Sequence, residues 1–308
     1  MSFGVPRVLG LHWTLFCGTR DGGRLCAFPF VTGPASVIAY CPQSLCYPSK
    51  LASLRLVRYP LSPLRQPLPL LRELRINSTQ SLGNYFTILD LCPQLEVLEV
   101  ACKLSPSSGN QPIRIAPRLH TFVFVGSYES AGSSLDYIHL PAIQLLSVTF
   151  NTIGWIPSYG AHLVDFLTRC GLDLQELRLS TPHISSEILV QCLQCVPNIN
   201  TLCLISQMID EAFVEAFTVP LNDCSGLCPR LEYLEFDTRQ RLATSLIASM
   251  IASRWRFHGG QRVARPLAVG LFPVIQEVSN RAEVRKCIQA GLKIYEYNSN
   301  GKWWALSL

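Results

Sequence analysis

CPQLEVLEV, residues 92–100, is the stretch that decides the fold. Its apolar residues Leu95, Leu98 and Val100 follow one spacing, in which two variable residues separate the first pair and one separates the second. Copies of this spacing begin at Leu51, Leu71, Leu95, Leu119, Ile143, Leu174, Ile199 and Leu231, which lie 20, 24, 24, 24, 31, 25 and 32 residues apart. Such a near-regular period is typical of a chain that stacks similar units, each burying its apolar face against its neighbours.

The repeated phrase is the core of a leucine-rich repeat. We therefore predict an α/β leucine-rich-repeat solenoid, with a curved parallel sheet and with helices and loops on the convex side. Successive side chains of a strand alternate between its two faces, so the phrase residues point into the core and the residues between them point to the concave face. The scaffold offers a surface and the pattern names no reaction, so we expect a binding protein that is not an enzyme and needs no cofactor.

The expected concave face has an apolar centre at Val97, Val123 and Leu145, with charged residues on both sides. An apolar centre within a polar rim is typical of a protein interface. The residues expected to bind a partner are Val97, Glu99, Thr121, Val123, Leu145, Ser147, Glu176, Arg178, Tyr233 and Glu235, with Glu73, Arg75, Thr201 and Cys203 on the same face. The alternative is that a long loop or the C-terminal tail covers the apolar centre.

Length and composition favour one elongated domain. The chain has 308 residues, of which 48% are hydrophobic and 15% charged. Residues 1–48 contain no copy of the phrase and several glycines and prolines, which predicts an irregular segment, either disordered or a cap. Residues 49–308 form the repeat domain, with a C-terminal cap from about residue 239. The net charge of +5 is spread without a basic stripe, and no apolar run reaches the roughly 18 residues of a membrane span.

Helical spacing appears between several of the phrases. Leu163, Phe166, Leu167 and Cys170 recur at helical spacing and predict one buried helix face. Near the end, the pattern predicts a helix over 239–251 and another over 282–290. Gly291 is placed to end the second helix, and a last strand is expected directly after it.

Thirteen cysteines raise the question of a metal site. Cys192 and Cys195, with Cys224 and Cys228, have a spacing at which thiolates bind zinc. Against zinc, Cys192 and Cys195 share a helical face with apolar residues, and cysteines recur at the end of connecting helices, where they pack as small hydrophobes. We therefore predict no metal, and keep an enzyme or zinc-binding protein as the least favoured class.

Arginines beside Trp255 resemble the mixture of basic and aromatic residues in nucleic-acid sites. Arginines at a helix terminus, where they meet carbonyl dipoles and cover apolar surface, explain the same residues, so a nucleic-acid partner is not expected. Residues 5–17 lack a clear signal-peptidase site, and an odd number of cysteines is typical of a reducing compartment. A cytoplasmic or nuclear location is predicted.

Several segments resemble fungal F-box proteins with C-terminal leucine-rich repeats. The resemblance covers roughly residues 49–297 and lies in PLLREL at 69–74, CPQLEVL at 92–98, CPRLEYL at 228–234, SRWR at 253–256 and QRVAR at 261–265, followed by Gly291 and Leu292. It implies that the repeats recruit a protein substrate for ubiquitin transfer, while an F-box ahead of the repeats docks a Skp-type adaptor.

Residues 1–48 depart from this family pattern. They lack the Leu-Pro-x-Glu-like start and the leucine-rich helices of an F-box. We expect either a truncated or mis-started member of the family, with the adaptor as a partner only if an F-box lies upstream, or a leucine-rich-repeat binding protein unrelated to ubiquitin transfer. The sequence does not identify the bound protein.

Overall fold

The computed structural model describes residues 36–39, 51–56, 67–80, 82–102, 112–127, 134–150, 159–180, 184–205, 209–219, 226–237, 242–259, 268–272, 275–297 and 303–305. The described strands are β1 (Ser36–Ala39), β2 (Ser53–Leu56), β3 (Glu73–Gln80), β4 (Val97–Cys102), β5 (Arg114–Ile115), β6 (Thr121–Gly126), β7 (Ile138–His139), β8 (Leu145–Phe150), β9 (Glu176–Ser180), β10 (Thr201–Ile205), β11 (Tyr233–Asp237), β12 (Ala268–Phe272), β13 (Lys293–Tyr297) and β14 (Trp303–Ala305). The described helices are α1 (Leu82–Leu91), α3 (Tyr159–Cys170), the 3-10 helix η1 (Gly171–Asp173), α4 (Ser186–Gln194), α5 (Glu211–Phe217), α6 (Thr244–Gly259), α7 (Ile275–Ser279) and α8 (Ala282–Gln289).

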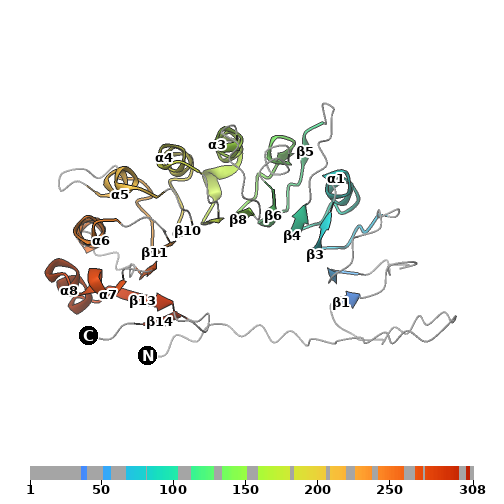
Figure 1. Cartoon of the computed structure of the whole chain (residues 1–308). Helices are drawn as coiled ribbons and strands as arrows, with labels where there is room; N and C mark the ends of the chain where they lie inside the picture. Colours follow the sequence, from blue (N-terminus) through green and yellow to red (C-terminus); the bar gives the residue numbers. More distant parts are fainter. Residues whose placement is uncertain are drawn as a thin grey trace.

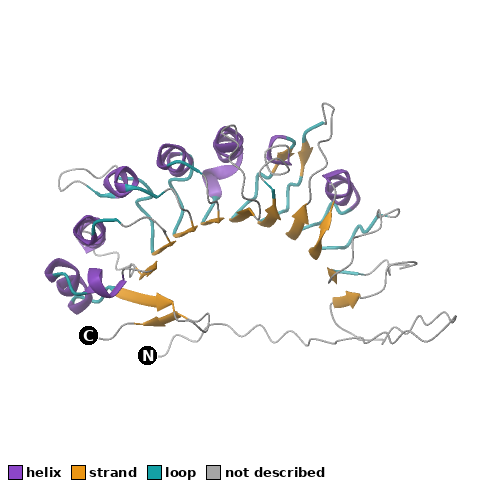
Figure 2. Cartoon of the chain, viewed as in Figure 1, coloured by secondary structure: helices purple, strands orange, loops and turns teal. Residues whose placement is uncertain are grey.

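The main feature is an open twelve-stranded sheet in the order β1-β2-β3-β4-β6-β8-β9-β10-β11-β12-β13-β14. Its strand pairs are parallel until the last, where β14 runs antiparallel to β13. The sheet is curved, with its strands along the inner side of an arc and α1, α3, α4, α5 and α6 along the outer side (Figures 1 and 2). We call the inner side the concave face and the outer side the convex side. The short strands β5 and β7 form a separate parallel pair.

The second and third residues of all eight apolar phrases lie in strands of the main sheet, and the first residue of each lies two positions before its strand. Strands β6 and β8 alternate strictly between buried and half-buried residues, which is the pattern of a sheet with one face in the core. The second residues of the phrases align across the sheet at Leu54, Leu74, Leu98, Phe122, Leu146, Leu177, Leu202 and Leu234. Each of these side chains is at most 1% exposed, so this line forms the centre of the core.

The helices cover the other side of this core. Leu163, Phe166, Leu167 and Cys170 of α3 are buried, which confirms the helix face predicted from their spacing. Helix α5 begins after Asp210, whose side chain accepts a hydrogen bond from the backbone N–H of Phe213 at 3.0 Å. No helix in the described part of the chain is long and apolar enough to cross a membrane.

Two glycines bring neighbouring helical layers close together. A Cβ atom on Gly160 of α3 would lie 2.8 Å from Cγ2 of Ile188 in α4. One on Gly171 would lie 2.7 Å from Cγ1 of Val196, which is fully buried. Both distances are shorter than normal carbon contacts, so a larger residue at either position would displace its neighbour.

The structure differs from the sequence predictions near the two ends of the sheet. Within the segment 1–48, β1 pairs with β2 and begins the sheet before the first phrase, while the rest of that segment lies outside the described residues. Strand β12 adds a further parallel strand between β11 and β13, where none was predicted. Helix α6 runs from Thr244 to Gly259 and so ends eight residues later than expected, because the first helix-breaking residues after 251 are Gly259 and Gly260.

Arg254 anchors the part of α6 that lies beyond residue 251. The side chain is only 2% exposed and lies over the ring of Phe217, with Cζ 3.6 Å from the ring centre. Its guanidinium donates hydrogen bonds to the carbonyl oxygens of Phe217 at 2.8 Å, Leu227 at 2.6 Å and Cys228 at 3.5 Å. Burial lowers the pKa of Arg254 to about 10, so the group remains charged at neutral pH. Arg254 therefore joins α6 to the end of α5 and to the turn before β11.

Candidate functional site

Two rows of side chains cross the concave face at right angles to the strands. The strand register aligns the first row through Glu73, Val97, Thr121, Leu145, Glu176, Thr201 and Tyr233. It aligns the second row through Arg75, Glu99, Val123, Ser147, Arg178, Cys203 and Glu235. All the residues expected on this face from the sequence lie in these two rows. Burial alternates strictly in β6 and β8, whereas β10 buries Leu202, Cys203 and Leu204 in succession.

The middle of the two rows is apolar and half-buried. Val97, Thr121, Val123 and Leu145 are neither fully buried nor fully exposed, because each side chain is flanked by those of the neighbouring strands. Ser147 is the one hydroxyl beside this group in the second row. Within the described part of the concave face, β4, β6 and β8 therefore place Val97, Val123 and Leu145 close together, with Glu99, Thr121 and Ser147 beside them. Such a surface stabilises contacts by burial of apolar area.

A Glu-Leu-Arg sequence borders the apolar centre on each side. On β3, Nε of Arg75 donates to Oε1 of Glu73 at 2.6 Å, and Nη1 of Arg75 lies 3.5 Å from Oε2 of Glu99. On β9, Nε of Arg178 donates to Oε1 of Glu176 in the same way. Burial alone would lower the pKa of Arg178, but the hydrogen bond from Arg178 to Glu176 and the negative charge of Glu176 outweigh it and raise that pKa. Each arginine is therefore fixed in place by a carboxylate on its own strand.

Glu235 lies beside two neutral hydrogen-bond donors and within electrostatic reach of Arg178. The hydroxyl of Tyr233 donates to Oε2 of Glu235 at 3.1 Å. Burial, and then the nearby charge of Glu235, raise the pKa of both Tyr233 and Cys203, that of Cys203 to about 12. Both groups are consequently protonated at neutral pH.

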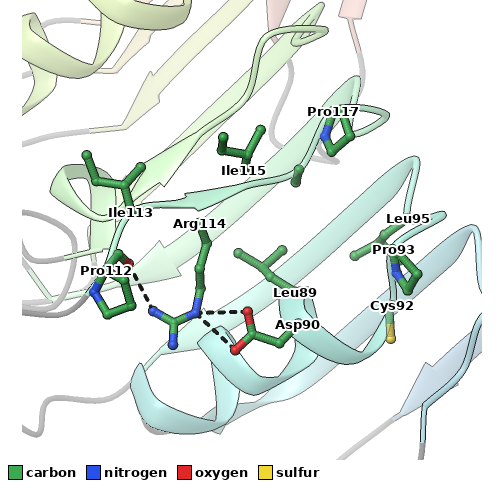
Figure 3. Close-up of a pocket in the computed structure, with 11 residues that line it drawn as sticks. Leu89, Asp90, Cys92, Pro93, Leu95, Pro112, Ile113, Arg114, Ile115 and Pro117 are labelled. Carbon is green, nitrogen blue, oxygen red and sulfur yellow. Dashed lines mark hydrogen bonds and ion pairs between the residues drawn. The ribbon is translucent and has the colours of Figure 1, made fainter.

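A separate cavity of about 480 Å³ lies on the convex side, between the end of α1 and β5 (Figure 3). Arg114 of β5 reaches across to α1, where its Nε lies 3.1 and 3.2 Å from the two carboxylate oxygens of Asp90 and its Cζ lies 4.4 Å from the ring centre of Phe86. Ile113 and Ile115, which are 60% and 66% exposed, lie on the opposite side of this strand from Arg114. The two charged groups pair with each other, and the other lining residues are mainly leucines, isoleucines and prolines.

Sequence reasoning did not find this cavity. Its strand β5 consists of two residues, which is too short for the alternation of apolar and polar residues to be recognised. The only available signal was the isoleucine pair Ile113 and Ile115, and two residues do not define a period.

The cysteines considered for zinc are not brought together in the described part of the chain. Cys192 is fully buried in α4, and the thiol of Cys195 donates to the carbonyl of Gln191 at 3.3 Å. Cys228 is 1% exposed, and burial raises its pKa to about 12. No group of three possible metal ligands occurs among the described residues, and Cys224 lies outside them.

The structure also describes the side chain of one arginine, Arg254, in the basic and aromatic segment that was compared with nucleic-acid sites. Arg254 is buried on carbonyl oxygens, as described above, and its guanidinium is not available to a phosphate group. The sequence offered the alternative of arginines at a helix terminus; Arg254 instead lies inside α6 and donates to carbonyl oxygens at the end of α5 and in the turn before β11. The side chain of Arg256, together with Arg262 and Arg265, lies outside the described residues.

Comparison with known proteins adds no relative: no family model matches the chain, and a search of curated proteins finds no significant match. The concave face therefore has to be interpreted from its own geometry.

Proposed function

We propose that this chain is a leucine-rich-repeat protein that recognises a partner protein with its concave face. The observation that carries the proposal is the alignment of two side-chain rows in which an apolar centre lies between two Glu-Leu-Arg sequences. An apolar centre buries area, and a polar border fixes orientation, which is the usual arrangement in protein interfaces.

The dimensions of the face favour a protein over a small ligand. Six strand steps separate β3 from β11 in the sheet order, which corresponds to roughly 29 Å at about 4.8 Å per step. Small-molecule sites are closed pockets that surround most of the ligand. The concave rows form an extended strip, and the described cavity lies on the other side of the sheet.

The resemblance to F-box proteins with leucine-rich repeats suggests what the partner is for. In that context the concave face would select a substrate for ubiquitin transfer, and a Skp-type adaptor would bind an F-box outside the repeats. The second candidate is a recognition role unrelated to ubiquitin. It is favoured by residues 1–48, which lack the leucine-rich helical pattern of an F-box.

Affinity capture from an extract of the source cells, with quantitative mass spectrometry, tests the recognition role. The test variant carries Val123→Asp and Leu145→Asp, which place two carboxylates in the apolar centre. The control variant carries Leu172→Asp, because Leu172 is 68% exposed in η1, outside the two rows. Circular dichroism and thermal melting check that both variants fold.

Interface energy is usually concentrated in a few central residues. We therefore expect a set of proteins that the wild type and the Leu172→Asp variant capture equally and that the double variant loses. A captured set that is unchanged in the double variant would place the binding surface elsewhere on the molecule.

A further inference from the structure

The uncharged centre of the concave face is wider than the two rows. The strand register aligns a third row beyond them, with Ala101, Val125 and Thr149 on β4, β6 and β8. All the described concave residues of these three strands are half-buried, and Glu99 is the only one with a charge. We call the other residues the uncharged patch: Val97, Ala101, Thr121, Val123, Val125, Leu145, Ser147 and Thr149.

The arginines on either side of the uncharged patch each interact with two carboxylates. Arg75 donates from Nε to Glu73 at 2.6 Å and places Nη1 3.5 Å from Oε2 of Glu99. Arg178 donates to Glu176 and lies within electrostatic reach of Glu235, two strands away in the same row. In both cases one carboxylate lies on the arginine's own strand and the other lies in the arginine's own row.

The two rows are balanced in charge when they are followed to the ends of the parallel sheet. The register places an arginine of β2 beside Arg75 and a lysine of β13 two strands from Tyr233. The described charged side chains of the two rows are then four cations and four carboxylates: Arg55, Arg75, Arg178 and Lys293, with Glu73, Glu99, Glu176 and Glu235. Asp237, two residues beyond Glu235 on β11, already has an interaction. The described side chains of these rows therefore carry no surplus of either sign.

This balance determines which partner groups the face attracts. A charged side chain placed beside Arg75 or Arg178 meets both signs within a few ångströms, so attraction to one group is offset by repulsion from the other. Over the uncharged patch, a charged side chain would lose water without gaining an opposite charge, which is unfavourable. An apolar side chain has neither disadvantage there and is stabilised by burial.

The separation of the two arginines sets the length of the uncharged region. Arg75 on β3 and Arg178 on β9 are four strand steps apart in the sheet order. At about 4.8 Å per step, this separation is roughly 19 Å. An extended chain advances about 3.3 Å per residue, so it crosses the region in about six residues.

We propose that the partner contributes an uncharged stretch of at least about six residues, whose apolar side chains cover the patch between Arg75 and Arg178. The proposal rests on the recognition function of the concave face and specifies its ligand. Arg75 and Arg178 determine specificity, because each occupies two carboxylates that would otherwise attract a cationic segment. Salt bridges to the partner make no contribution to this recognition.

Selection from a library of random twelve-residue peptides displayed on phage tests this inference. The full 308-residue chain is the target, and parallel selections use its Arg178→Met and Val123→Asp/Leu145→Asp variants. We expect the wild type to enrich peptides with an uninterrupted uncharged, largely apolar stretch of at least about six residues. The Val123→Asp/Leu145→Asp variant should not enrich this class. Arg178→Met leaves Glu176 and Glu235 without their cation, so this variant should enrich peptides that contain arginine or lysine.

Arg118→Met is the matched control for Arg178→Met. It removes the same charge from an exposed turn before β6, outside the rows, and should enrich the same peptides as the wild type. Thermal melting checks that all the variants fold.

The salt dependence of binding separates the charge role of Arg178 from a structural one. By fluorescence polarisation, an enriched peptide should bind the wild type with an affinity that changes less than about twofold between about 50 and about 500 mM sodium chloride, because salt screens only charge interactions. Basic peptides selected on Arg178→Met should bind that variant at least about tenfold more weakly at the higher salt concentration. A mere loss of packing at Arg178 would lower affinity without creating this salt dependence.

Three results would overturn the inference. Wild-type peptides that need a charged residue, or that bind at least about tenfold more weakly in high salt, would refute the uncharged segment and leave recognition by the concave face intact. An Arg178→Met variant that enriches only the wild-type class would refute the role of Arg178 in specificity. Failure to enrich any peptide would refute a linear segment as the ligand, whereas an unchanged captured set in the double variant would refute the recognition function itself.

Discussion

Truncation of Leu177 to alanine tests the strand register on which the concave face depends. Leu177 is 0% exposed in β9 and lies between Leu146 and Leu202 of the adjoining strands. Removing three buried carbons costs about 2.4 kcal/mol in transfer free energy. Because strands are paired with β9 on both sides, the space cannot close completely, and a residual cavity of about 50 Å³ adds about 1.2 kcal/mol. The expected loss is about 3.6 kcal/mol, within a range of about 2 to 5 kcal/mol.

The neighbouring residue provides the control. Arg178 is exposed on the concave face, with 55% of its side chain accessible, and its contact with Glu176 is a surface ion pair. Such pairs contribute about 0 to 1 kcal/mol, so Arg178→Ala should change the free energy of unfolding by less than about 1 kcal/mol. Urea denaturation followed by circular dichroism measures both values under the same conditions. Equal losses for the two variants would refute the assignment of Leu177 to the core and of Arg178 to the concave face.

Four further outcomes are expected. Arg254→Met should lower the free energy of unfolding by about 3 kcal/mol in urea denaturation, because three buried carbonyl oxygens lose a cationic donor. The control Arg230→Met, at an exposed site, should have little effect. Burial raises the pKa of Cys92 from 9.0 to about 12. Above pH 9 the thiol therefore loses its proton in the unfolded chain but keeps it in the native one. The contribution of the buried thiol to stability is complete below pH 9 and decreases as the pH rises above it. Wild-type stability should therefore fall more steeply than that of Cys92→Ala between pH 9 and 11, by about 1.4 kcal/mol per pH unit, and equal slopes would contradict the burial. Metal analysis should find no stoichiometric zinc, and one zinc per molecule that disappears in Cys195→Ser would reverse this conclusion. Calorimetry should detect no binding of the 308-residue chain to a Skp-type adaptor, because residues 1–48 lack the helical apolar period of an F-box; a micromolar complex would show that this segment has been misinterpreted.

The central part of the sheet could be predicted from the sequence because its signal is repeated. Each apolar phrase fixes one strand, and the alternation within that strand then determines which residues share a face. This is why Val123 and Arg178 could be assigned to one surface without coordinates. The helix face of α3 was predictable for the same reason, since Leu163 and Cys170 belong to a regular helical spacing.

Other features depend on contacts between residues far apart in the sequence. The environment of Glu235 arises because β10 lies beside β11, which brings Cys203 close to it, and no local pattern encodes this. Likewise, Arg254 binds the carbonyl of Phe217, a residue 37 positions earlier. Strands β1 and β12 were not predicted, because their sequences do not contain the full spacing of three apolar residues. Their position depends on pairing with the neighbouring strands β2 and β11.

Gly160 in α3 and Gly171 in η1 influence the radius of the arc. Strands in a sheet are about 4.8 Å apart, whereas packed helices are usually 8–10 Å apart, and this mismatch bends the molecule toward its strands. The close approach of Gly160 to Ile188, and of Gly171 to Val196, reduces the mismatch between these two layers. The sheet therefore bends less at β9 and β10 than it would with larger residues, which sets how far apart Arg178 and Glu235 lie. A partner can thus be sensitive to a glycine on the far side of the molecule that it never touches.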